Sequence, residues 1–118
     1  MAQYIDCFVM PIPKKNLATY RKMAKASAKA WKKAGALKYF EAVGDDVPKG
    51  KITSFPKSVK LKTGEKVVFG YAIYKSRAHR NAVMKRIHQD PVMMKYWENM
   101  PFDGMRMIWA GFKGFVSA

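Results

Sequence analysis

Cysteine is almost absent from this chain of 118 residues, which contains a single one, Cys7. No disulfide can form within the chain, and no Cys or His cluster has the spacing of a structural metal site. Long apolar runs are absent too. None approaches the roughly 20 residues that cross a bilayer, and the opening MAQYIDCFVMPIP has no basic segment followed by a sustained apolar one. These absences predict a cytoplasmic protein with no membrane segment and no bound metal.

Acidic residues are also scarce, because 8 Asp and Glu face 23 Lys and Arg, which gives a formal charge of +15. A Gly-rich phosphate loop, a GxSxG elbow and an HExxH helix are missing, so we expect no cofactor. The 49% of hydrophobic residues is enough for a globular core. Because the chain is too short for two independent cores, we expect a single domain over residues 1–118.

Hydrophobic periodicity divides the first part of the chain into strand, helix and strand. Residues 3–10 alternate as a strand, and we expect the two prolines that follow to end it, because proline cannot donate to a sheet ladder. Apolar residues then recur every three or four positions from 14 to 34, a helix that Gly35 ends. Residues 36–43 are a second strand. Alternation in the first strand places Ile5, Cys7 and Val9 on one face, and Tyr4, Asp6, Phe8 and Met10 on the other.

The rest of the chain begins with a weakly patterned connection, residues 44–65, which is long for a compact domain. Such a loop is either a lid or partner contact, or a simple surface excursion. Residues 66–74 are almost wholly apolar and predict a central strand. A helix over 77–89 follows, with a short further turn reaching residue 96. Residues 105–112 are the last strand.

The resulting order, β-α-β-β-α-β, is that of the ferredoxin-like α+β fold. Its usual form is an antiparallel four-stranded sheet with both helices on one face. The predicted strands carry apolar residues on both faces, so the second face also needs cover. The simplest cover for so short a chain is a second copy, and we therefore expect a homodimer that pairs sheet to sheet.

Several short motifs occur together along the chain. They are a GDDVP turn, an SFP followed by a Val-Lys pair, a YxSRAxR helix start and an MPFDGxRMI strand entry. In this combination, and nearly from end to end, the sequence resembles the YbaA-like bacterial family of unknown function. The chain is more basic than the members of that family.

The resemblance implies a fold of the dimeric α/β-barrel superfamily, in which two ferredoxin-like sheets pair into one barrel. It implies no settled activity. The superfamily includes cofactor-independent monooxygenases and isomerases, so such an enzyme is one alternative for this chain. The other interpretation is a protein that binds a small molecule in a cleft between sheet and helices, with no assigned reaction.

Charged residues on otherwise apolar faces are the candidates for that cleft. Asp6 shares a strand face with Tyr4 and Phe8, and Arg80 falls on the core side of its helix. The last strand lies next to the first in this topology, so an Asp6 to Arg106 cross-strand pair is possible. Asp6, Arg80 and Arg106 are therefore either a polar ligand site or an internal ion-pair network. Tyr71 is the aromatic candidate, either for a planar ligand or for the core.

A strongly basic helix face suggests a third interpretation, which is nucleic-acid binding. Between Lys14 and Lys38 there are nine basic residues and no acid. This face either contacts RNA or DNA, through Lys25, Lys29, Lys32 and Lys33, or is simply solvated. Lysine outnumbers arginine on it, which favours the solvated face because bidentate phosphate contacts use arginine. His79 and His88 fall on opposite sides of their helix and cannot share a metal.

Overall fold

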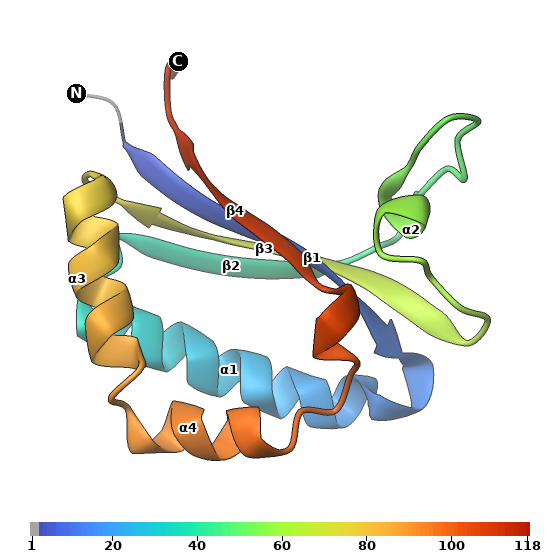
Figure 1. Cartoon of the computed structure of the whole chain (residues 1–118), viewed down its shortest axis with the longest axis horizontal. Coiled ribbons are helices and arrows are strands. Elements are labelled where there is room, and N and C mark those ends of the chain that lie inside the picture. The colour runs from blue at the N-terminus through green and yellow to red at the C-terminus, as the bar shows by residue number, and fades with distance from the viewer. Residues whose placement is uncertain (1–2) are drawn as a thin grey trace.

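An antiparallel sheet of four strands, with helices packed on one face, forms the architecture of the computed structural model, which describes residues 3–118 (Figure 1). The elements are β1 (Tyr4–Pro13), a 3-10 turn (Lys14–Asn16), α1 (Leu17–Ala34), β2 (Lys38–Val43), α2 (Phe55–Ser58), β3 (Glu65–Tyr74), α3 (Arg77–Ile87), α4 (Pro91–Glu98), a second 3-10 turn (Gly104–Arg106) and β4 (Ile108–Lys113). The strand order is β2-β3-β1-β4. The predicted ferredoxin-like α+β fold is confirmed.

β1 continues through both of its prolines, so the prediction that they end the strand is wrong. β1 pairs with β3 over its whole length, from Tyr4 opposite Tyr74 to Pro13 opposite Glu65. Its pairing with β4 stops earlier, at Val9 opposite Ile108. Beyond Val9 one edge of β1 is therefore free, and a proline without an N–H is tolerated at a free edge.

The helices begin and end at the residues that capping chemistry favours. α1 ends at Gly35, whose φ of 115° is a left-handed conformation suited to glycine. Ser76 caps α3 by accepting the His79 N–H, and the Arg86 guanidinium donates to the Ala34 carbonyl at 2.6 Å, which joins α3 to the end of α1. Asp90 caps α4, a full helix where the sequence predicted a short turn.

The two faces of the sheet have different cover. α1, α3 and α4 lie on one face, and Figure 1 shows the segment that carries α2 at the far end of the sheet. From this segment Val59, which is 1% exposed, packs against Val9 and Val67. The rest of that second face has no cover from residues 3–118. It exposes large apolar side chains, namely Phe40, Phe69, Ile108 and Phe112.

Candidate functional site

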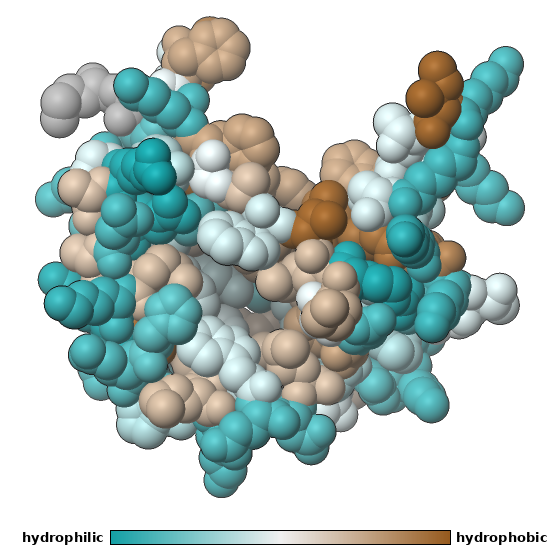
Figure 2. Space-filling view, viewed as in Figure 1, coloured by the Kyte–Doolittle hydropathy of each residue, from teal (hydrophilic) through white to brown (hydrophobic). Residues whose placement is uncertain are grey.

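A cavity of about 710 Å³ lies between the sheet and the helix layer. Its size is that of a site for a small organic ligand. Figure 2 shows the hollow in the face of the molecule where helices and sheet meet, with pale and brown residues around it and hydrophilic ones further out. Every strand and the helices α1, α3 and α4 contribute to the wall. The lining includes Asp6, Phe8, Met10, Tyr20, Met23, Ser27, Trp31, Tyr39, Ala72, Arg80, Met84, Lys85, His88, Trp97, Phe102, Met107 and Trp109.

Aromatic side chains form much of this wall. The chain has three tryptophans, and all of them line the cavity, Trp31 from α1, Trp97 from α4 and Trp109 from β4. The Trp31 indole donates a hydrogen bond to the Tyr74 hydroxyl at 3.1 Å, which fixes its ring beside the cavity. Trp109 is 62% exposed. The fluorescence of this protein therefore reports on the cavity wall.

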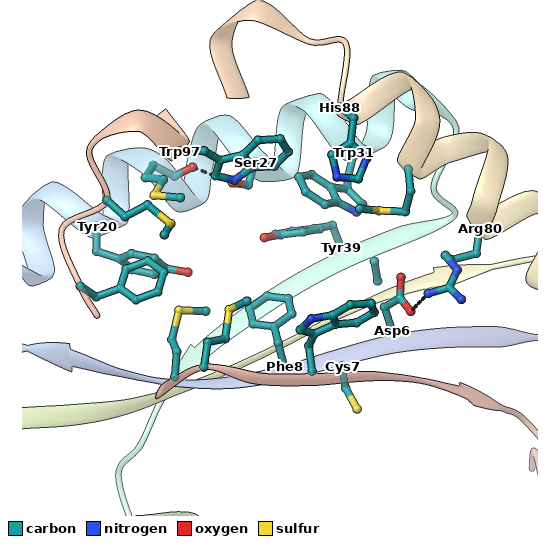
Figure 3. Close-up of a pocket in the computed structure, with 18 of the residues that line it drawn as sticks. Asp6, Cys7, Phe8, Tyr20, Ser27, Trp31, Tyr39, Arg80, His88 and Trp97 are labelled. Atoms are coloured by element: carbon teal, nitrogen blue, oxygen red, sulfur yellow. Dashed lines mark hydrogen bonds and ion pairs between the residues drawn. The ribbon is translucent and has the colours of Figure 1, made fainter. Parts of the chain in front are cut away.

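Asp6 and Arg80 meet in the cavity wall as an ion pair of 2.8 Å, with both side chains 13% exposed (Figure 3). Asp6 comes from the helix-facing side of β1, and Arg80 from the first turns of α3. The guanidinium also lies over the Tyr4 ring, 5.1 Å from its centroid. Burial raises the pKa of Asp6, and the nearby Arg80 charge opposes that effect. The sequence placed both residues on core-facing positions, and the structure brings them together.

Arg106 does not belong to this cluster, so the predicted Asp6 to Arg106 pair is wrong. The last strand begins three residues later than its apolar pattern suggested, because Asp103 caps a 3-10 turn that contains Arg106. The guanidinium binds Glu65 through two hydrogen bonds of 2.6 and 2.7 Å and Asp103 through one of 3.0 Å. Arg106 lowers the pKa of Glu65 in this arrangement. It joins the turn before β4 to the start of β3.

Tyr71 also lies outside the cavity. It is paired with Cys7 across β1 and β3, and both residues belong to the side of the sheet away from the helices. The Tyr71 ring lies 5.6 Å from Phe40 and 6.1 Å from Phe69, between ring centroids. Figure 3 shows the Cys7 side chain pointing away from the cavity in the same way. Of the candidates Tyr71, Arg80 and Arg106, only Arg80 therefore lines the cavity.

Two tyrosines and a glutamate form the polar group that the sequence analysis missed. The Tyr39 hydroxyl donates to Glu41 Oε2 at 2.5 Å, and the Tyr20 hydroxyl of α1 donates to Glu41 Oε1. Figure 3 shows the Tyr20 and Tyr39 hydroxyls pointing toward one another beside the cavity. Gly70 lies opposite Glu41 on β3, and a Cβ there would come within 2.9 Å of the Glu41 Cγ. The glycine makes room for the glutamate side chain.

Glu41 has hydrogen bonds but no ion-pair partner among residues 3–118. In the part of the chain that the structure describes, ion pairs join Arg80 to Asp6, and Arg106 to Glu65 and Asp103. Burial raises the pKa of Glu41, and the two tyrosine hydroxyls offset only part of this effect. Burial and the Glu41 charge also raise the pKa of both tyrosines well above the usual value, so their hydroxyls stay protonated.

Comparisons with known proteins place the chain in a family. Residues 3–104 match the family model described as "Protein of unknown function (DUF1428)". The chain belongs to the DUF1428 family. It is also similar to the "Uncharacterized protein YbaA" of Escherichia coli K12 and of Shigella flexneri, with 40% identity over 114 residues that cover 97% of this chain and 97% of each relative.

Solved structures confirm the fold of this DUF1428 protein. "Structure of Rv0793 from Mycobacterium tuberculosis" matches with a TM-score of 0.59 and 15% identity, over 100% of this chain and 99% of that one. A dimeric ferredoxin-like protein from an uncultured marine organism matches with a TM-score of 0.57 and 12% identity, over 100% and 98%. At these identities the likeness concerns the fold alone.

The remaining candidates of this DUF1428 chain lie at its surface. Lys25, Lys29, Lys32 and Lys33 are exposed on the outer side of α1, away from the cavity. The His79 ring accepts the Lys75 N–H at 2.9 Å, and the His88 ring lies 5.6 Å from Trp97 in the cavity wall. No three His, Cys, Asp or Glu side chains of residues 3–118 gather as metal ligands. None of the helices in that range is long and apolar enough to cross a membrane.

Proposed function

We propose that this protein binds a small organic molecule with an apolar or aromatic body in the cavity between sheet and helices. The cavity itself carries the proposal. About 710 Å³ of space is walled by three tryptophans and several methionines. Two polar groups converge on it, the Asp6 to Arg80 pair and the Tyr20 and Tyr39 hydroxyls, and Ser27, Asn81, Lys85 and His88 complete the polar part of the wall. Apolar walls with a few convergent polar groups are characteristic of small-molecule sites.

We further propose that the protein is a homodimer paired through the open face of the sheet. Phe40, Phe69 and Phe112 are 47%, 36% and 53% exposed on that face. An exposed apolar patch of this kind marks a protein interface more often than a free surface. The ferredoxin-like protein from an uncultured marine organism, which has the same fold, is described as dimeric. Cytoplasmic location stays a prediction, supported by the unpaired Cys7.

Tryptophan fluorescence tests the binding proposal without knowledge of the ligand, because every tryptophan lines the cavity. A series of para-tert-butylphenyl compounds, one cationic, one neutral and one anionic, serves as the probe. We expect at least one of them to change the emission with saturation, and calorimetry to give the same stoichiometry. If none of the three binds, the proposal is wrong.

A pair of matched variants locates the binding. Ser27→Leu fills part of the cavity, because Ser27 is 5% exposed in its wall. Ala82→Leu adds a larger side chain at an exposed position of α3 outside the cavity lining instead. We expect Ser27→Leu to weaken probe binding at least tenfold and Ala82→Leu to leave it within twofold. Equal effects of the two variants would place the binding outside the cavity.

A further inference from the structure

The Glu41 carboxylate, next to two tyrosines of the cavity wall, has no ion-pair partner in the part of the chain that the structure describes. The Asp6 carboxylate is neutralised by Arg80 at 2.8 Å, whereas Glu41 has only two hydroxyl donors. Buried charges are normally paired, because removing an ion from water is costly. A ligand that brings a positive charge to this place would supply the missing partner.

The hydrogen-bond directions around Glu41 favour the same kind of ligand. Both Tyr20 and Tyr39 use their hydroxyl proton to donate to the carboxylate. Both tyrosines line the cavity, with their hydroxyls pointing toward one another beside it, and Glu41 is not among the lining residues (Figure 3). A hydroxyl that has given its proton away offers only lone pairs in other directions. A ligand in the cavity therefore meets two acceptors at this point, which suit N–H groups and not a carbonyl or carboxylate.

Aromatic rings pack around Tyr39, which carries one of these acceptors. The Tyr39 ring has Trp31 on one side, at 5.4 Å between centroids, and Phe8 on another, at 6.4 Å. Ring faces attract a cation within about 6 Å of their centre, most strongly for tryptophan. The wall thus combines aromatic rings with the Tyr20 and Tyr39 hydroxyls, which are hydrogen-bonded to the Glu41 carboxylate.

We propose that the ligand is an organic ammonium ion with an apolar or aromatic body, whose N–H groups bind the Tyr20 and Tyr39 oxygens in front of Glu41. This inference rests on the proposed binding function and specifies its ligand class. The other basic groups of the wall do not oppose it strongly. Arg80 is paired with Asp6, while Lys85 and His88 are exposed, and at physiological salt exposed charges are screened beyond about 8 Å.

Three compounds of one shape test the charge preference. They are para-tert-butylbenzylammonium, para-tert-butylbenzyl alcohol and para-tert-butylbenzoate, titrated at neutral pH with tryptophan emission and calorimetry as readouts. We expect the ammonium ion to bind at least tenfold more tightly than the alcohol, and the benzoate to bind most weakly. Glu41→Gln keeps the side chain's shape and removes its charge, so it should abolish the preference for ammonium over alcohol. Glu98→Gln, at an exposed position on α4, is the matched control and should retain the preference.

The outcomes separate this inference from the function on which it rests. If the alcohol or benzoate binds as tightly as the ammonium ion, or if Glu41→Gln keeps the preference, the ammonium proposal is wrong and the binding proposal stands. If no compound binds, both are wrong. Circular dichroism checks that Glu41→Gln folds. Should it fail to fold, Tyr39→Phe removes one acceptor oxygen and leaves Glu41 in place, and it should reduce the ammonium preference at least threefold, with an unchanged preference counting against the proposal.

Discussion

On the face of the sheet that the helices cover, the strands present charged and hydrogen-bonding side chains, among them Asp6 and Tyr39, which line a cavity, and Glu41, which is hydrogen-bonded to Tyr39. On the opposite face the same strands present Cys7, Phe40, Phe69, Tyr71 and Phe112. The two faces are therefore suited to different occupants. A few polar groups in an apolar cavity wall are typical of a ligand site, whereas an exposed apolar surface is typical of a protein interface. Because side chains alternate along a strand, neighbouring residues in one sequence serve both purposes.

Breaking the Asp6 to Arg80 ion pair on the covered face has the largest expected effect, which is a loss of stability. Asp6→Ala leaves Arg80 without its partner in a site where both side chains are 13% exposed. We expect a loss of about 3 kcal/mol in the free energy of unfolding, because an unpaired buried charge is strongly destabilising. Urea unfolding at one fixed protein concentration measures it. Asp46→Ala, which removes an exposed carboxylate, is the control and should change stability little. A loss below about 1 kcal/mol for Asp6→Ala would mean that the pair is not a structural part of this face.

Placing a charge on the open face should break the dimer and leave the cavity intact. Phe69→Glu introduces a carboxylate near the middle of the sheet's open side, where burial by a second copy would remove it from water. We expect the dimer dissociation constant, from sedimentation equilibrium, to rise about a hundredfold, which is about 3 kcal/mol. Val92→Glu makes the same change on α4, at a position 54% exposed on the helix layer. If Val92→Glu weakens the dimer more than Phe69→Glu does, the open face is not the interface.

The raised pKa of Glu41 makes the stability of the protein depend on pH. The folded state holds the Glu41 proton more tightly than the unfolded state, so Glu41 lowers stability as pH rises above the ordinary pKa of 4.5. Tyr20 and Tyr39 face the carboxylate directly and stay protonated, and Asp6 and Arg80 stand further along the wall. We expect the difference in unfolding free energy between Glu41→Gln and the natural protein to grow in favour of the variant as pH rises from 4 through that range. A difference that stays constant with pH would show that Glu41 does not titrate as its burial predicts.

Replacing the exposed lysines of α1 should have the smallest effect on ligand binding and on dimer formation. Lys25, Lys29, Lys32 and Lys33 are exposed and contribute nothing to the cavity wall. We expect replacement of all four by alanine to leave probe binding within twofold and the dimer unchanged, because exposed charges are screened by salt. The nucleic-acid interpretation predicts in addition a strongly salt-dependent binding of RNA that these replacements abolish. Filter binding at two salt concentrations decides whether that interpretation has any support.

The sequence correctly predicted which side chains face the helices where the pattern of a single strand or a single helix determines their direction. Alternation placed Asp6 and Phe8 opposite Cys7 and Val9, and the helical period placed Arg80 toward the core. Tyr71 could not be placed in this way, because β3 is apolar on both sides and its own pattern does not fix which residue faces the helices. Arg106 was misplaced because an Asp103 cap delays the last strand.

Glu41 shows what sequence reasoning lacked. Its two hydroxyl partners come from β2 and from α1, and the Tyr20 contact spans 21 residues of sequence. The strand alternation does put Tyr39 and Glu41 on one side of β2, which is the one local signal for the group. Nothing in the local pattern says that a glutamate on an edge strand is partly buried, because that depends on how α1 packs across the sheet and on the space that Gly70 leaves.

A crystal structure of the protein with para-tert-butylbenzylammonium tests the division between the two faces most directly. We predict electron density for the compound in the cavity, with its ring against Trp31 and its nitrogen within hydrogen-bond distance of the Tyr20 and Tyr39 hydroxyls, and a second copy of the chain packed on the open face. Density for the compound on the open face, with only water between sheet and helices, would contradict the account.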